Sequence, residues 1–201
     1  MASELTERLA KEVAKYEAIL AAYWKTDVAL DRDFQRSFNG FYQLRQHPKD
    51  WYGHFYRILE GLKSREQTFG QILQEMLKCT GRVEASFASK ALATRDPEQP
   101  IIDKWVLTFL RQRAGFVPPS PSARNRIERW SSLHAQMATW YRSFSSTPEG
   151  IEYIRWFDAT CPGRDVSSIK KLDFVIYITK GDAALLKVLS GKSRGVLNST
   201  A

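Results

Sequence analysis

The chain has 201 residues, 43% of them hydrophobic and 26% charged, which suits one globular domain with a proper core. Two distant cysteines, Cys79 and Cys161, and three scattered histidines argue against a disulfide framework, an iron–sulfur cluster and a metal site. A net charge of +8 favours an anionic partner such as nucleic acid, with a plain solvated basic surface as the alternative.

The N-terminus is acidic and then amphipathic, which differs from a secretory signal. No apolar run approaches the ~18 residues of a membrane span. We therefore expect a cytoplasmic protein in a reducing compartment, without a membrane partner and without a cofactor.

Hydrophobic residues recur at spacings of three and four along the first half of the chain, which predicts helices. Ser3 is the expected N-cap of the first helix, and Gly81 is expected to end the fourth. The predicted helices cover residues 4–25, 34–42, 48–62, 69–81, 82–94 and 102–113.

The second half begins with a loop over 114–124, rich in Gly, Pro and Ser. A long helix over 127–144 and a short one from Pro148 follow. Ser168 is a candidate cap for a last element, but the apolar, β-branched run over 170–179 leaves helix and strand both open. The expected fold is all-α.

The expected domain organisation is a single helical domain over 1–190, with its most informative segment over 65–115. The last residues, 191–201, are expected to form a flexible tail.

Asp103 is the most unusual residue of this domain, because it lies at the start of an apolar helix. One interpretation is an N-cap for the helix that carries Trp105 and Val106. The other is a catalytic carboxylate. Trp105 is likewise either a core residue or a platform on which a base stacks.

Basic residues gather around the proline-rich loop, where only Glu128 opposes them between positions 104 and 129. Such a cluster suits contact with phosphates, and a solvated helix face is the alternative. The cluster consists of Lys104, Arg111, Arg113, Arg124, Arg126 and Arg129.

A helix, a tight turn at Gly81, a small-residue helix, and Ile-Ile-Asp-x-x-Val before another helix resemble the helix-hairpin-helix (HhH-GPD) DNA glycosylase superfamily. The resemblance covers residues 65–115. In that superfamily the hairpin grips a DNA phosphate through backbone N–H groups, and an Asp at a helix N-terminus lies beside the extruded base. Segment 34–46 also resembles small bacterial proteins of unassigned function.

The resemblance implies that Gly81 and Arg82 form the hairpin turn and that Asp103 is the catalytic acid. The family turn is usually Gly-x-Gly, whereas this chain has one glycine. The family lysine, an amine nucleophile, would fall near Ser86, and Lys90 lies one turn later. A monofunctional mechanism follows, in which Asp103 stabilises an oxocarbenium-like sugar and orients a water.

The sequence therefore predicts a DNA-binding base-excision protein, a hydrolase of N-glycosyl bonds. The alternatives are a non-catalytic nucleic-acid-binding protein on the same scaffold and a helical protein–protein interaction module. The candidate catalytic residues are Asp103 and Lys90, the candidate stacking residue is Trp105, and the candidate DNA contacts are Gly81, Arg82, Ser86, Lys104, Arg111, Arg113, Arg124 and Arg126.

Overall fold

The structure is a computed structural model that describes residues 2–44 and 47–189. Within those ranges the chain is all-α and has no strand, as the periodicity predicts. A short helical segment over 183–189 follows the last labelled helix. The labelled helices are α1 (Ala2–Lys25), α2 (Arg32–Tyr42), α3 (Lys49–Gly61), α4 (Phe69–Thr80), α5 (Ala85–Arg95), α6 (Lys104–Ala114), α7 (Arg126–Ser145), α8 (Pro148–Thr160) and α9 (Ser168–Thr179).

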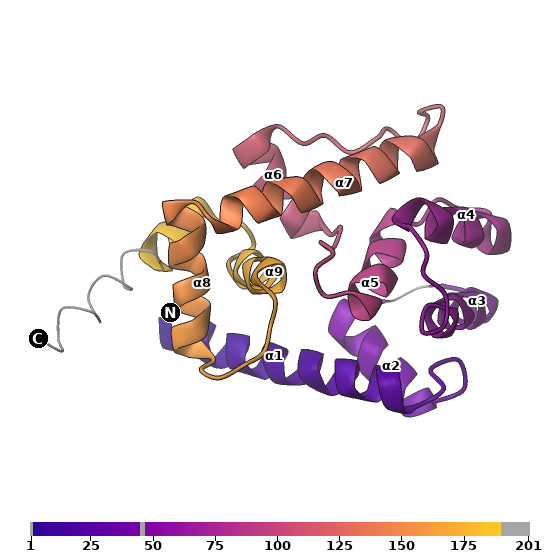
Figure 1. Cartoon of the computed structure of the whole chain (residues 1–201), viewed down its shortest axis with the longest axis horizontal. Helices are drawn as coiled ribbons and strands as arrows, with labels where there is room; N and C mark the ends of the chain where they lie inside the picture. Colours follow the sequence, from indigo (N-terminus) through magenta and orange to yellow (C-terminus); the bar gives the residue numbers. More distant parts are fainter. Residues whose placement is uncertain (1, 45–46, 190–201) are drawn as a thin grey trace, which may run out of the picture.

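Helices α1, α6, α7 and α8 surround α9, which Figure 1 shows end-on. In that view α1 runs below it, α7 above it and α8 to its left, and α9 contacts all three as well as α6. At the other end, α4 contacts α3, α5 and α7. Long-range packing around one central helix thus produces a continuous core.

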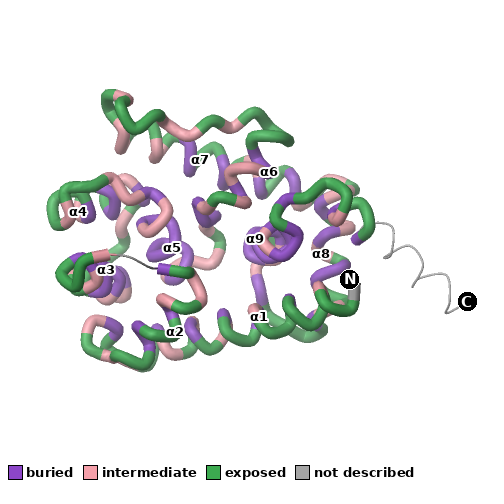
Figure 2. Tube along the Cα trace, turned by 180° about the vertical axis from the view of Figure 1, so that it is seen from behind, coloured by how far each residue is buried: buried purple, intermediate pink, exposed green. Residues whose placement is uncertain are grey.

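Helix α9 is buried on nearly all sides, as the purple trace of Figure 2 shows. The run that left helix and strand open is therefore a helix. An interior helix has no polar face, so its sequence lacks the amphipathic period that marks a surface helix. Its N-cap is Ser167, whose hydroxyl accepts the N–H of Lys170 at 3.2 Å, so the expectation of a cap at Ser168 was wrong by one residue.

Several predicted boundaries differ from the structure. The first helix already includes Ser3, so Ser3 is not its cap. The fifth helix begins at Ala85 rather than 82, because Gly81 adopts a left-handed φ of 70° and the chain needs residues 82–84 to turn. The sixth begins at Lys104 rather than 102, because Asp103 is its cap.

The connection between α4 and α5 has one residue with left-handed φ, Gly81, which caps α4. The backbone N–H of Arg82 donates to Thr80 Oγ1 at 3.3 Å. This N–H group is therefore already bonded within the turn. That this turn corresponds to the DNA-binding hairpin of the glycosylase superfamily stays a prediction.

No helix in the described part of the chain is both long and apolar enough to cross a membrane. The predicted flexible tail, residues 191–201, lies outside the described residues.

Candidate functional site

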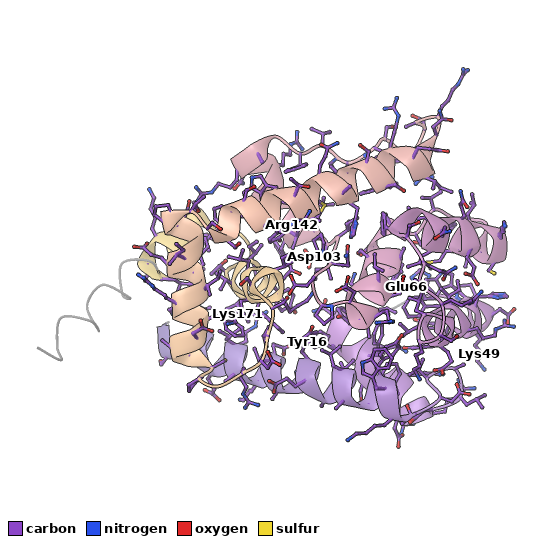
Figure 3. All side chains as sticks on the ribbon, in the orientation of Figure 1. Tyr16, Lys49, Glu66, Asp103, Arg142 and Lys171 are labelled. Carbon is purple, nitrogen blue, oxygen red and sulfur yellow. The ribbon has the colours of Figure 1, made fainter. Side chains whose placement is uncertain are left out.

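A pocket of about 340 Å³ opens between α5, α6 and α9 on one side and α1 and α2 on the other. Figure 3 places Asp103 near the centre of the molecule, between α9 and α5, with Tyr16 of α1 below it. The walls combine aromatic rings with charged groups. They are formed by Glu12, Phe41, Tyr42, Gln43, Lys90, Ile101, Asp103, Lys104, Trp105, Lys170, Asp173, Phe174 and Tyr177.

The segment before Asp103 has no helical structure of its own, and side chains from α5, from α7 and from the N-cap of α9 fix its backbone. Ser89 of α5 accepts the N–H of Ile102 at 2.8 Å. The ring of His134 in α7 lies 3.0 Å from the Pro100 carbonyl oxygen. Ser167, at the start of α9, donates to the Pro97 carbonyl at 2.8 Å.

Buried His134 also stacks on Phe69, with ring centroids 4.2 Å apart. Burial lowers the pKa of His134 to about 4, and the bond to Pro100 opposes that shift. The imidazole is therefore neutral near pH 7, so its Nε2–H donates to the Pro100 carbonyl.

Asp103 caps α6. Its Oδ1 accepts the N–H groups of Trp105 at 2.7 Å and of Val106 at 2.8 Å. The N-cap interpretation is thus confirmed. Both bonds go to Oδ1, so the cap does not use Oδ2, and the residue also lines the pocket. A carboxylate at this position benefits from the positive end of the helix dipole.

Lys90 belongs to α5 and is 7% exposed. Its Nζ donates to the Ser86 hydroxyl at 2.6 Å and lies 5.4 Å from the centroid of the Phe87 ring. Burial lowers the pKa of Lys90 to about 8, Asp103 acts against this shift, and Lys170 adds to it. About one tenth of the amine is therefore unprotonated at pH 7.

A second pair of charges lies deeper, on α9. Lys170 Nζ contacts Asp173 Oδ2 at 3.0 Å, and the two residues are 3% and 2% exposed. Burial opposes the charge of Lys170, but the interactions with Asp173, Tyr16 and Tyr42 together outweigh it and raise the pKa of Lys170 above its usual value. Burial raises the pKa of Asp173 as well, and Lys170 opposes that shift. Lys170 therefore stays protonated through the neutral range.

Three cations lie over two aromatic rings, Trp105 and Tyr177, that line the pocket. Lys104 and Lys180 lie 4.7 and 5.8 Å from the Trp105 ring centroid. Arg8 of α1 lies 5.5 Å from the Tyr177 ring, whose hydroxyl accepts a bond from Gln43 at 3.2 Å. All three cations are exposed, and of these Lys104 lines the pocket, as does the acidic Glu12.

The structure brings four of the predicted site residues to this pocket: Lys90, Asp103, Lys104 and Trp105. Ser86 is bonded to Lys90. The remaining predicted DNA contacts do not line it. These are Gly81, Arg82, Arg111, Arg113, Arg124 and Arg126.

Apart from Lys104, the basic cluster around the proline-rich loop is thus separate from the pocket. Arg113 bonds to Glu149 of α8 at 2.6 and 3.1 Å, which neutralises part of the cluster. Arg111 and Arg124 are exposed. The roles of these residues in binding DNA stay predictions.

Sequence reasoning missed Lys170, Asp173, Tyr42 and Tyr177. A signal for two of them was available, because Lys170 and Asp173 interrupt an otherwise apolar run, and buried charges require partners. The missing step was to recognise that run as an interior helix.

Within residues 2–44 and 47–189, no group of three or more His, Cys, Asp or Glu side chains is arranged to hold a metal ion. Both cysteines are free, Cys79 at the surface and Cys161 in the interior.

No protein-family model, curated protein or solved structure matches the chain. The proposals below therefore rest on the residues of the pocket and on the sequence resemblance.

Proposed function

We propose that the pocket binds a single base extruded from DNA, and that Lys90 and Asp103 cleave the N-glycosidic bond of that base. The observation that carries the proposal is the placement of a buried amine and a helix-capping carboxylate in one small cavity. A volume of about 340 Å³ is at the small end of ligand pockets, which span about 300–1,000 Å³. Aromatic walls suit a flat ligand.

Cleavage of the N-glycosidic bond needs a group that stabilises the positive charge on the sugar and a nucleophile that attacks C1′. Departure of the base leaves positive charge on the sugar, which the Asp103 carboxylate stabilises. The Lys90 amine forms a bond to C1′ through its lone pair, while the glycosidic electron pair leaves with the base. The proton lost from the amine passes to Asp103, which returns it to the ring oxygen O4′ as the nitrogen lone pair breaks the C1′–O4′ bond, and the open sugar is then an iminium.

The proposed nucleophile differs from the water that the sequence suggested. An exposed lysine is protonated and unreactive near pH 7, whereas burial lowers the pKa of Lys90 into the range where a lysine can act as an amine. The lysine of the family would fall near Ser86. We propose that Lys90, one turn later in α5, takes its place, because the Lys90 amine reaches back to the Ser86 hydroxyl.

The exposed cations over Trp105 and Tyr177 support the choice of DNA as the partner. Lys104, Lys180 and Arg8 lie where phosphates on either side of an extruded nucleotide would approach. We propose that these three side chains hold the strand, whereas Arg113 is held by Glu149.

The proposal is tested by base release from DNA duplexes that carry a panel of oxidised, deaminated and alkylated bases. Asp103→Asn removes the charge but keeps a good cap, so it should abolish release without unfolding α6. Asp31→Asn is a matched control, because Asp31 caps α2 through Oδ1 in the same way, away from this pocket. Release by neither wild type nor control, or equal release by Asp103→Asn, would contradict the proposal.

A second candidate is non-catalytic binding of nucleic acid, which the two cap bonds of Asp103 favour, because they explain this residue without chemistry. It predicts salt-dependent DNA binding that survives Asp103→Asn. In that case Lys104→Gln and Lys180→Gln should each lower the slope of log affinity against log salt by about one.

A further inference from the structure

A polar groove of about 540 Å³ lies between α2 and α3, apart from the pocket that holds Lys90 and Asp103. In the interior the two helices are joined by aromatic contacts, with the Phe38 ring 5.7 Å from Phe55 and 6.0 Å from Tyr56. At the surface their facing sides leave the groove open. Its walls include Arg32, Arg36, Asn39, Lys49, Tyr52 and Gly53. Figure 3 shows Lys49 at the end of the molecule opposite α8.

The groove carries positive charge. Three of its wall residues are cations, and no carboxylate of the described residues lines it. Within residues 2–44 and 47–189, neither Arg32 nor Lys49 forms an ion pair. Arg36 pairs with Asp33, but both side chains are largely exposed, and such a pair is weak. A groove lined by one sign of charge attracts an anionic partner.

Gly53 keeps this groove open, and the fold itself does not require a glycine there. The residue lies in the middle of α3, where glycine is the least favourable residue after proline. A Cβ at Gly53 would meet no atom of the described residues within 4 Å, and its φ is not left-handed. Its carbonyl accepts the Nε–H of Arg57 at 3.1 Å, which brings a fourth cation beside the groove. Glycine at such a position suits the close approach of a ligand to the backbone.

Helix α2 leads from this groove toward the pocket. Arg32 and Asn39 are two turns apart on one face of α2, which is about 10 Å at 1.5 Å per residue. Gln43, four residues after Asn39, lines the pocket. A DNA strand has one phosphate about every 3.4 Å along the helix axis, so a groove of this length faces about three phosphates.

We infer that the groove between α2 and α3 binds the phosphate backbone of a DNA strand, with Arg32, Arg36 and Lys49 as its phosphate contacts. The inference rests on the proposed function for the choice of DNA, but it does not require the chemistry of Lys90 and Asp103. An anionic membrane surface suits the groove less well, because among the described residues no aliphatic side chain lines it.

The charge of the groove is tested by binding of the full-length protein to an undamaged DNA duplex, measured by fluorescence anisotropy over a range of salt concentrations. Arg32→Gln and Lys49→Gln should each lower the slope of log affinity against log salt by about one. Lys78→Gln, at an exposed position of α4 outside the groove, is the control and should keep the wild-type slope. Circular dichroism checks the fold of each variant.

The open space of the groove is tested without any change of charge by Gly53→Leu. Gly40→Leu is the matched control, because Gly40 is also exposed, helical and beside open space, but does not line this groove. Both variants should unfold at or above the wild-type temperature, since leucine is a better helix former than glycine. Gly53→Leu should weaken DNA binding at least as much as Lys49→Gln does, whereas Gly40→Leu should keep the wild-type affinity.

Unchanged salt slopes in both charge variants, or wild-type affinity in Gly53→Leu, would overturn the inference and leave the groove as a solvated basic surface. Binding to vesicles of phosphatidylserine that is lost in the same variants, without binding to DNA, would overturn it in favour of a membrane surface.

The failure of this inference is distinct from the failure of the proposed function. Base release by the wild type, together with normal DNA binding by the groove variants, would leave the proposed function intact and overturn the inference alone. Binding that depends on the groove, without release from the lesion panel, would support the inference and contradict the proposed chemistry.

Discussion

Ser89 Oγ accepts the backbone N–H of Ile102 at 2.8 Å, and both residues are buried. Ser89 precedes Lys90 in α5, and Ile102 precedes Asp103 at the start of α6. This one hydrogen bond therefore joins the two segments that carry the candidate catalytic groups. The same Ser89 hydroxyl donates to the Ser86 carbonyl at 2.9 Å.

Ser89→Ala should leave the Ile102 N–H buried without a partner. We expect a loss of about 1–3 kcal/mol in the free energy of unfolding, measured by urea denaturation. Ser131→Ala is the matched control, because among the described residues the Ser131 hydroxyl bonds only to the Ile127 carbonyl of its own helix, at 2.8 Å. A loss in the control as large as in Ser89→Ala would argue against a special role for the Ser89 bond.

Asp103→Ala should destabilise the protein by about 1 kcal/mol, because α6 loses its N-cap. Asp103→Asn should cost much less, since Asn is an equally good cap. Thermal unfolding of the two variants separates the cap from the charge. A large loss for Asp103→Asn would show that the carboxylate stabilises the fold through its charge rather than through the cap bonds.

Lys90→Met should stabilise the protein near pH 7 and lose this advantage at high pH. The unfolded chain binds the Lys90 proton up to about pH 10.5, whereas the folded protein releases it at about pH 8. The cost of the buried charge is therefore fully present below pH 8 and disappears as the pH rises to 10.5. It is roughly 3 kcal/mol at most. Denaturation at pH 7 and pH 10 should show a gain for Lys90→Met that shrinks with pH, whereas Lys78→Met, at an exposed position, should show none.

His134 should make the fold sensitive to acid. Its pKa is about 4 in the folded protein and about 6.5 in the unfolded chain, so the unfolded chain binds the proton first. Stability attributable to His134 is intact above pH 6.5 and falls by roughly 3 kcal/mol as the pH drops to 4. In His134→Gln the slope of unfolding free energy over this range should be smaller. An unchanged slope would contradict a buried neutral imidazole.

Asp103→Asn should shift the titration of Lys90 downward, because the Asp103 charge raises the pKa of Lys90 toward its ordinary value. The shift is measured from the Lys90 side-chain NMR signal as a function of pH. Asp31→Asn should leave the titration unchanged. Equal titration curves in wild type and Asp103→Asn would contradict an electrostatic interaction between Lys90 and Asp103.

The sequence predicts the all-α fold because most helices lie at the surface and have one apolar face, as α1 does. An N-cap was one of the two interpretations of Asp103 from the sequence, and the structure has this cap, a feature set by neighbouring residues. The interior helix α9 could not be assigned, because burial on all sides removes the period. Lys90 and Asp103 are only thirteen residues apart, so local helices bring them together.

The partners from distant parts of the chain could not be predicted. Lys170 and Asp173 reach the pocket through the packing of α9 against α1 and α6. Local spacing contains no information on such contacts. The partner of Arg113 could not be predicted for the same reason, since Glu149 belongs to the distant helix α8.

Borohydride trapping tests the central claim, that Lys90 attacks the sugar of a bound nucleotide. Wild-type protein is incubated with duplexes from the lesion panel and with abasic DNA in the presence of sodium borohydride, and cross-linked peptides are identified by mass spectrometry. The account predicts a covalent protein–DNA adduct on Lys90 that is absent in Lys90→Gln and retained in Lys78→Gln. An absence of adduct with every duplex, or an adduct that persists in Lys90→Gln, would contradict it.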